Sequence, residues 1–460
     1  MSTAGPTVPP SIPEDPPRLI DPVSAATTHA PPSPLTTVTD SETGGLRRRS
    51  LMHHHDFRQL WIGDTGSQLG AALGSLAVPY LAVTALKATP FQMGLLSTLS
   101  GLGFLVIGLP AGAIVDRRSK RRVMISADLA RAALLATLPA AWWLGVLSLA
   151  QLLAVATLVG MLTVFFDVSY QSYLPFLVPD QQVVEGNAKL QASQSVSQSA
   201  GPALGGLLLK VIGPPVVVLA NAGGYLLSAV FLHRIRHRET PAPTAARPPL
   251  FTEIGEGLRF VIRHKILRRL IACTGLGNFA SSGGGALLVL FMLRDLHLSP
   301  LIIGIIDSSA AVGGLVGALL ATALARRVGE GPSIVLTAVA TVLFAFCNPL
   351  SAVLAPVPTL IIGGVLLTAA MVAYNIATVS FRQRLCPPDL LGRMNASARF
   401  LVWGTIPLGA MAGGLLGTHI GVLPTLWLFA GLGLLSILPV ASGTLWRLKR
   451  LPDHDDPGQG

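Results

Sequence analysis

Ionisable side chains interrupt several long apolar stretches of this sequence, and they are the residues best able to carry chemistry. They are Asp64, Asp128, Arg131, Asp167, Asp307 and Arg399. Carboxylates in apolar surroundings can bind and release protons near neutral pH. Asp307 and Asp64 have no obvious partner nearby in the sequence, so we take these two as the candidates for a proton site.

The remaining ionisable residues have simpler interpretations. Asp128 and Arg131 are three residues apart, so they share one face of a helix and can pair. Asp167 lies near the end of its apolar stretch, and Arg399 lies in the first turns of another. We expect structural roles for the pair and for Asp167. A structural role also stays open for every single acid, because buried ion pairs perturb proton binding in the same way.

The composition indicates where these residues reside. Soluble domains carry about 25% charged residues, whereas this chain of 460 residues is 12% charged and 51% hydrophobic. The mean hydropathy is +0.61, and together these values predict an integral membrane protein. The net charge of +11 comes from short basic blocks between apolar runs, which argues against nucleic-acid binding. The three cysteines and the tract His53–His55 lack metal-site spacing, so we predict no metal and no cofactor, and the tract is interpreted as a titratable cap.

Twelve segments are long and apolar enough to cross a membrane, which takes about 20 residues. They lie near residues 60–85, 92–115, 123–145, 147–168, 190–211, 214–233, 269–293, 301–325, 333–350, 355–378, 397–418 and 421–445. Two pairs are almost fused and require tight turns at Gly145 and Gly421. Loops on one side carry nearly all the basic residues, and the other side has only Lys87, Lys210 and Arg294. The positive-inside rule therefore places both chain ends in the cytoplasm of a plasma-membrane protein.

The chain is expected to contain five regions in order. They are a disordered Pro/Ser/Thr-rich tail (1–55), a six-helix bundle (56–233), a linker (234–265), a second six-helix bundle (266–446) and a tail (447–460). The linker ends in FTEIGEGLRFVIRH (251–264), whose apolar residues share one face. We expect this segment to be a helix that lies on the cytoplasmic membrane surface.

The two bundles repeat one pattern at a shift of about 210 residues. TPFQMGLL at Thr89 matches SPLIIGII at Ser299, and GPALGGLL at Gly201 matches GAMAGGLL at Gly409. Repeated six-helix halves are typical of transporters, whose substrate site lies near the middle of the membrane where the halves meet.

Three stretches resemble the major facilitator superfamily over residues 55–450. GAIVDRRSKRR (112–122) resembles its loop signature at Gly112, Asp116, Arg117, Arg121 and Arg122. GPALGG resembles the antiporter signature of proton-coupled exporters at Gly201, Pro202, Gly205 and Gly206. The segment from Phe165 to Leu208 is similar to the subgroup of enterobactin exporters and macrolide or multidrug efflux proteins. The second-half loop LARRVGEG (324–331) keeps the basic pair without the acid, and SQLGAALG (67–74) lacks an acid that the subgroup often has.

The resemblance implies an all-α membrane fold with twelve spans in two pseudo-symmetric bundles. It implies that Asp116 caps the start of the eleventh span and locks the cytoplasmic side, at about 0.3–2 kcal/mol. It also implies that spans 2, 5, 8 and 11 form the seam between the halves. The spans that line the cavity would contribute Asn278, Tyr374 and Asn375.

The sequence therefore predicts a monomeric secondary transporter that exchanges protons for a small hydrophobic molecule moving outwards, with membrane lipid around it. An uptake carrier of the same fold and a non-transporting membrane sensor are the alternatives. No nucleophile–base arrangement predicts an enzyme, and no GxxxxGK[ST] loop predicts ATP binding in this chain.

Overall fold

The computed structural model describes residues 51–116, 118–179, 182–237, 250–386, 391–441 and 444–447, together with Gly5. Within these ranges the chain is helical and contains no strand. The helices belong to one compact unit, residues 50–460. The predicted tail before residue 51 (Gly5 apart), residues 238–249 of the linker and the chain beyond 447 lie outside the described residues.

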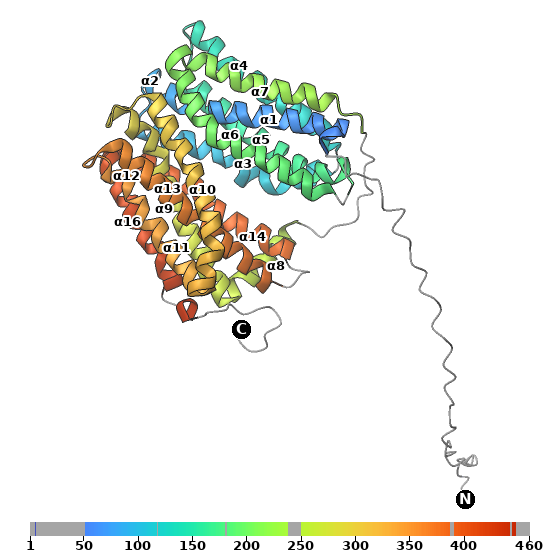
Figure 1. The fold of residues 1–460 in the computed structure, drawn as a ribbon, viewed down its shortest axis with the longest axis vertical. Coiled ribbons are helices and arrows are strands. Elements are labelled where there is room, and N and C mark those ends of the chain that lie inside the picture. Colours follow the sequence, from blue (N-terminus) through green and yellow to red (C-terminus); the bar gives the residue numbers. More distant parts are fainter. Residues whose placement is uncertain are drawn as a thin grey trace, which may run out of the picture. The chain divides into compact units, whose positions relative to one another are not determined.

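The first half contains seven α-helices, drawn in blue to green in Figure 1. They are α1 (His55–Gly74), α2 (Ala77–Thr84), α3 (Pro90–Asp116), α4 (Lys120–Trp143), α5 (Leu149–Leu177), α6 (Val183–Ile212) and α7 (Pro214–His233), preceded by the 3-10 helix η1 (Leu51–His53). The predicted first span is formed by α1 and α2 together, because the chain turns at Ser75 and Leu76 and Pro79 supplies no backbone N–H to bridge that turn.

The second half repeats this arrangement after the linker helix α8 (Leu250–Arg263). Its helices, yellow to red in Figure 1, are α9 (Lys265–Arg294), α10 (Pro300–Val328), α11 (Glu330–Ala345), α12 (Cys347–Leu350), α13 (Pro356–Leu385), α14 (Leu391–Trp403), α15 (Thr405–His419) and α16 (Val422–Ala441), followed by η3 (Thr444–Arg447). The eleventh predicted span is divided into α14 and α15 at Gly404, three residues before Pro407.

Eleven helices or helix pairs in the described ranges are long and apolar enough to cross a membrane. The segment predicted as the fifth span, near 190–211, does form a helix, α6, but α6 is not among these eleven. Its amino-terminal half is rich in Gln and Ser, which lowers its hydropathy. The twelve-helix architecture therefore holds with one helix that is unusually polar for a bilayer.

The helix contacts of the two halves correspond one to one. In the first half α1 packs on α6 and α7, α3 on α5, and α4 on α7. In the second half α9 packs on α15 and α16, α10 on α13, and α11 on α16. Even the backbone repeats, since Lys87 and His297 occupy matching positions and both adopt a left-handed conformation, with φ of 48° and 53°.

Glycine makes the two tight turns that the sequence predicts. Gly145 has φ of 71° and Gly421 has φ of 91°. This conformation carries no steric penalty for glycine, whereas a β-carbon disfavours it. The predictions for both turns are confirmed.

The linker segment forms the predicted helix, α8, and this helix packs against other helices of the second half. It packs against α14 and α9, and Val261 is buried in a cluster with Ile271, Met394, Ala398 and Val402. Val261, on the apolar face, is therefore covered by protein side chains, whereas Ile262 on the same helix is 49% exposed. The location of α8 on the membrane surface stays a prediction.

Candidate transport pathway and proton site

The first contact between the halves joins α3 to α15. A β-carbon on Gly94 would lie 2.5 Å from the α-carbon of Gly414, so the two backbones touch. The backbone N–H of Phe91 donates to Oγ1 of Thr418 at 3.0 Å. One to two turns further along α3, Oγ1 of Thr98 donates to a backbone carbonyl of α15, that of Pro407, at 3.1 Å.

The second contact joins α6 to α10 in the same manner. A β-carbon on Gly206 would lie 2.3 Å from the carbonyl oxygen of Pro300, and one on Gly304 would lie 2.2 Å from that of Pro202. The backbone N–H of Ala203 donates to Oγ of Ser308 at 2.9 Å. Approaches this close require the small residues that the sequence places here.

The two contacts are related by the repeat. Gly94 of the first half corresponds to Gly304 of the second, and Gly206 corresponds to Gly414. Gly94 and Gly414 meet in the first contact, and their counterparts Gly304 and Gly206 lie in the second. A pseudo-twofold axis between the halves requires this exchange. The expectation that spans 2, 5, 8 and 11 form the seam is matched by α3, α6, α10 and α15.

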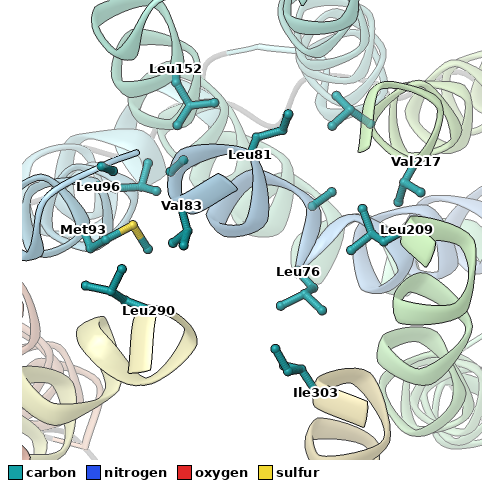
Figure 2. Packing of buried hydrophobic residues seen from close by; sticks show 14 of the residues in the cluster. Leu76, Leu81, Val83, Met93, Leu96, Leu152, Leu209, Val217, Leu290 and Ile303 are labelled. Atoms are coloured by element: carbon teal, nitrogen blue, oxygen red, sulfur yellow. The ribbon is translucent and has the colours of Figure 1, made fainter. Parts of the chain in front are cut away.

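Buried apolar clusters distinguish the two ends of the bundles. We call the end with the α2–α3 and α9–α10 turns the far end, and the end with the linker the linker end. At the far end a single cluster contains Leu81, Met93 and Leu209 of the first half and Leu290 and Ile303 of the second (Figure 2). At the linker end the described clusters each draw on one half alone. Among the described clusters, the one at the far end is the only one that draws on both halves.

The seam between α6 and α10 also opens towards the linker end. Ser308 contacts α6, and Leu315 and Leu319 continue the same face of α10 by helical periodicity. Nevertheless, Leu315 is 66% exposed and Leu319 is 68% exposed. The face that packs at the far end is thus uncovered two to three turns closer to the linker.

The ionisable residues of the first half gather around one arginine. Arg131 forms an ion pair with Asp128 on the same helix, α4, and both are buried. The guanidinium also lies over the rings of Phe166 and Tyr225, 4.5 and 4.1 Å from their centroids, and donates to Oγ1 of Thr163 at 3.3 Å. The predicted pairing of Asp128 with Arg131 is present in the structure.

Two further acids join this pair from other helices. Asp64 of α1 is 3% exposed and lies beside Tyr170 and Gln68. Its carboxyl group also interacts electrostatically with those of Asp128 and Asp167. Asp167 of α5 is exposed and close enough to Arg131 to interact with its charge. Three carboxyl groups therefore lie close enough to interact with one another, and two of them, those of Asp128 and Asp167, also interact with the guanidinium of Arg131.

This cluster contains unsatisfied carboxyl oxygens. Oδ1 of Asp64 and Oδ2 of Asp128 are buried and have no hydrogen-bond partner. A buried ionised carboxylate with an unpaired oxygen is costly. A proton on one carboxyl would remove a charge from the cluster, so the arrangement is chemically suited to binding and releasing protons.

The second half holds its ionisable residues differently. Asp307 of α10 is exposed, and no hydrogen bond or ion pair joins it to any described residue. Arg399 of α14 is exposed and lies over the ring of Trp403, 5.4 Å from its centroid. Arg399 also interacts with the charge of Arg382, which is positive too.

The predicted cavity residues have mixed environments. Nδ2 of Asn278 donates to the carbonyl of Val402 at 3.1 Å, at the end of α14. The hydroxyl of Tyr374 is 2.8 Å from that of Thr274, which links α13 to α9. Asn375 is exposed. Asn278 and Tyr374 thus hold helices together, and the amide of Asn375 faces open space.

The loop signature lies between α3 and α4. Asp116 is the last residue of α3, and its side chain, like Arg117 as a whole, is outside the described residues. Arg121 donates to the backbone carbonyls of Leu232 and His233 at the end of α7, and Arg122 is exposed. The helix dipole and the two carbonyls explain why basic residues follow α3 here.

A polar stripe on α6 was missed by reasoning from the sequence. Gln191, Ser195 and Gln198 are spaced so that they share one face of the helix, and all three are exposed. Exposed amides at the depth of a bilayer are tolerated where they face water and not lipid. The signal was present in the sequence, since no other predicted span carries so many Gln and Ser residues at this spacing.

Two repeated bundles that meet along paired glycine contacts, with acids enclosed between helices, are typical of membrane transporters. The family model described as "Transmembrane secretion effector" matches residues 50–456. The chain belongs to that family, a branch of the major facilitator superfamily, whose members are transporters and not enzymes.

Individual relatives agree with this assignment. The multidrug efflux pump Tap of Mycolicibacterium fortuitum is 27% identical over 401 residues, which cover 83% of this chain and 93% of Tap. Macrolide efflux protein A of Streptococcus pyogenes is 25% identical over 265 residues, which cover 57% of this chain. The match spans 65% of that relative's length.

Solved structures show the same fold. A bacterial homologue of the iron transporter ferroportin, in an inward-facing state, superimposes with a TM-score of 0.69 and 17% identity. The match covers 85% of this chain and 98% of the homologue. At this level of identity the likeness concerns the fold alone.

Proposed function

We propose that this protein is a proton-coupled exporter of small hydrophobic molecules that works by alternating access. The observation that carries the proposal is the apolar core shared by the halves at the far end, with separate cores at the linker end. A bundle joined at one end only can rock about that end. The names of relatives, which are macrolide and multidrug efflux proteins, support outward transport of drug-like molecules.

The structure then represents an inward-facing state in the plasma membrane. The basic loops support a cytoplasmic location of the linker end by the positive-inside rule, and that is the end where Leu315 and Leu319 are uncovered. Both chain ends are cytoplasmic in this proposal. A single chain contains both halves and the seam, so we propose that the monomer, embedded in lipid, is the working unit.

The proton site in this proposal is the cluster of the first half. Asp128 and Asp167 share the charge of Arg131, Asp64 interacts with both acids, and one buried oxygen each of Asp64 and Asp128 has no hydrogen bond. Protonation of one of these carboxyl groups, with a movement of the Arg131 guanidinium from one carboxylate to another, would change the net charge enclosed by α1, α4 and α5. Because these helices belong to one rocking bundle, such a change can bias the inward–outward equilibrium.

The closing of the cytoplasmic side is assigned to the loop signature. In the outward-facing state Asp116 would approach the amino-terminal end of α14, where the helix dipole favours an acid. The basic residues Arg117, Arg121 and Arg122 would anchor the loop at the membrane surface. Within the antiporter-type motif, Pro202 and Gly206 would provide the sliding surface of α6 against α10, whereas Gly201 and Gly205 hold α6 close to α1.

The proposal is tested with cells and vesicles that contain the full chain. Cells should extrude macrolides and fluorescent drugs, and a protonophore should stop the extrusion. Asp128→Asn and Asp64→Asn should remove the dependence on the proton gradient, whereas Asp295→Asn, in the loop after α9, should not. Extrusion that ignores the protonophore would contradict proton coupling, and net accumulation would identify an uptake carrier.

A further inference from the structure

Asp307 and the polar stripe of α6 lie on different halves, yet they occupy the same depth. The helices run antiparallel, with Gly206 beside Pro300 and Pro202 beside Gly304. Four residues closer to the linker end on each helix, Gln198 of α6 is therefore level with Ser308 of α10. Ser308 is the residue next to Asp307. The amide and the carboxylate lie at one level of the bundle.

Both groups also lie on the side of the seam that faces away from lipid. On α6, helical periodicity turns Gln191 and Gln198 away from the exposed apolar residues Leu207 and Val211. Gly201 and Gly205 of α6 contact α1, so the stripe lies between the surface that packs on α1 and the surface that packs on α10.

The same argument applies to α10. Asp307 is on the opposite side of the helix from the exposed apolar residue Val316. Gly313 and Gly317 direct another face of α10 towards α13. The carboxylate therefore faces the space between the halves, the space that the stripe of α6 also faces.

The chemistry of this space is specific. Amide side chains both donate and accept hydrogen bonds, so they match hydroxyl and carbonyl groups. Asp307 has no protein partner to neutralise it, so a cationic group is its complement. The exposed Leu315 and Leu319 follow on the same helix, closer to the linker end, and offer apolar contact.

We propose that Asp307 and the stripe Gln191, Ser195 and Gln198 form the substrate site, and that its ligand is an amphiphilic, hydroxyl-rich amine. The ammonium group pairs with Asp307, the hydroxyls bind the amides of α6, and the apolar part lies on Leu315 and Leu319. This inference rests on the proposed export function. It assigns Asp307 to the cargo and leaves proton binding to the first half.

Direct binding tests the site without any transport step. The probe is doxorubicin, a fluorescent amine that carries hydroxyls and a flat apolar ring system, and the matched probe is its N-acetyl derivative, which is neutral. Affinities are measured by fluorescence with the full-length protein in lipid nanodiscs. Asp307→Asn should weaken doxorubicin about tenfold or more, as for loss of a charge-assisted contact, and should leave the neutral probe nearly unchanged.

The stripe variants should behave differently. Gln191→Ala and Gln198→Ala should weaken both probes by about two- to tenfold, as for loss of neutral hydrogen bonds. Gln151→Ala is the matched control, since that amide donates to Thr137 at 3.1 Å far from the stripe and should change neither affinity. Thermal unfolding of each variant separates lost binding from lost folding.

Three outcomes would overturn the site. Asp307→Asn could weaken both probes equally, the stripe variants could bind as the unaltered protein does, or Asp307→Asn could bind normally and lose only proton-driven transport. The last result would make Asp307 the proton carrier. Failure of the export proposal looks different, because the binding differences would persist while a protonophore had no effect on transport.

Discussion

In the first half, Asp64, Asp128 and Asp167 interact with one another and two of them with Arg131, whereas in the second half Asp307 has no ion pair or hydrogen bond among the described residues and Arg399 lies over Trp403. The helix packing of the two halves is nevertheless equivalent, down to the left-handed residues Lys87 and His297. The repeat therefore maintains the contacts that let two bundles slide. The ionisable residues differ between the halves, and the two proposals above assign proton binding to the first half and cargo binding to Asp307 in the second.

The largest effect expected from this comparison concerns the buried pair. Arg131→Met leaves Asp128 buried and uncompensated, which should lower the free energy of unfolding by about 3–5 kcal/mol. Arg399→Met, in the other half, should change it by no more than about 0.5 kcal/mol because Arg399 is exposed and has no acid partner.

Thermal and denaturant unfolding in detergent measure both variants. The double variant Asp128→Asn/Arg131→Met should recover much of the stability without recovering proton-driven export. Equal stability of Arg131→Met and the unaltered protein would show that the cluster does not need its arginine.

The next effect concerns the seam. Gly206→Ala places a methyl group 2.3 Å from a backbone carbonyl, and such overpacking costs about 1–3 kcal/mol. Transport should fall severely because the halves must part slightly at the far end. Gly223→Ala is the matched control, since a β-carbon there meets nothing within 4 Å.

The equivalent contact in the other seam sharpens the comparison. Gly414→Ala should impair transport less than Gly206→Ala, because its nearest atom is 2.8 Å away. Drug export from cells, normalised to the amount of protein in the membrane, gives the order. Normal export by Gly206→Ala would mean that the close approach is dispensable.

The α3–α4 loop of the first half and the α10–α11 loop of the second should respond unequally to loss of an acid. Asp116→Asn should reduce transport while the protein remains in the membrane, by shifting the inward–outward equilibrium about 0.3–2 kcal/mol. The second-half acid, Glu330, instead pairs with Arg384 of its own half at 2.9 Å, and both are partly exposed. Glu330→Gln should therefore have little effect, and export by Asp116→Asn at the normal rate would argue against a lock in the first half.

The smallest effects concern the hydrogen bonds across the seam. Thr98→Val removes the bond to Pro407, and Ser308→Ala removes the bond from Ala203. Each should shift the equilibrium by about 0.5–1.5 kcal/mol. Distances between spin labels at the linker end, measured by electron paramagnetic resonance, report the shift. A large change for one and none for the other would show that the two seams are not mechanically equivalent.

Much of the architecture could be predicted from the sequence because its causes are local. A span needs a run of apolar residues, and a tight turn needs a glycine with positive φ. The repeat is detectable because the same residue types recur at a nearly constant shift. Gly145 and Gly421, and the equivalence of Gly94 with Gly304, follow from such patterns. The pairing of Asp128 with Arg131 also follows, since three residues bring them to one helix face.

The sequence by itself thus determined the membrane class, the helix order, the glycine seam and the signature loop of this transporter. Only the tertiary structure decided that Asp64, Asp128 and Asp167 converge, that Val261 is covered by α14, and that the halves share a core at one end. These features join helices far apart along the chain. Periodicity within a helix shows which residues share a face, but the packing of helices decides what that face meets.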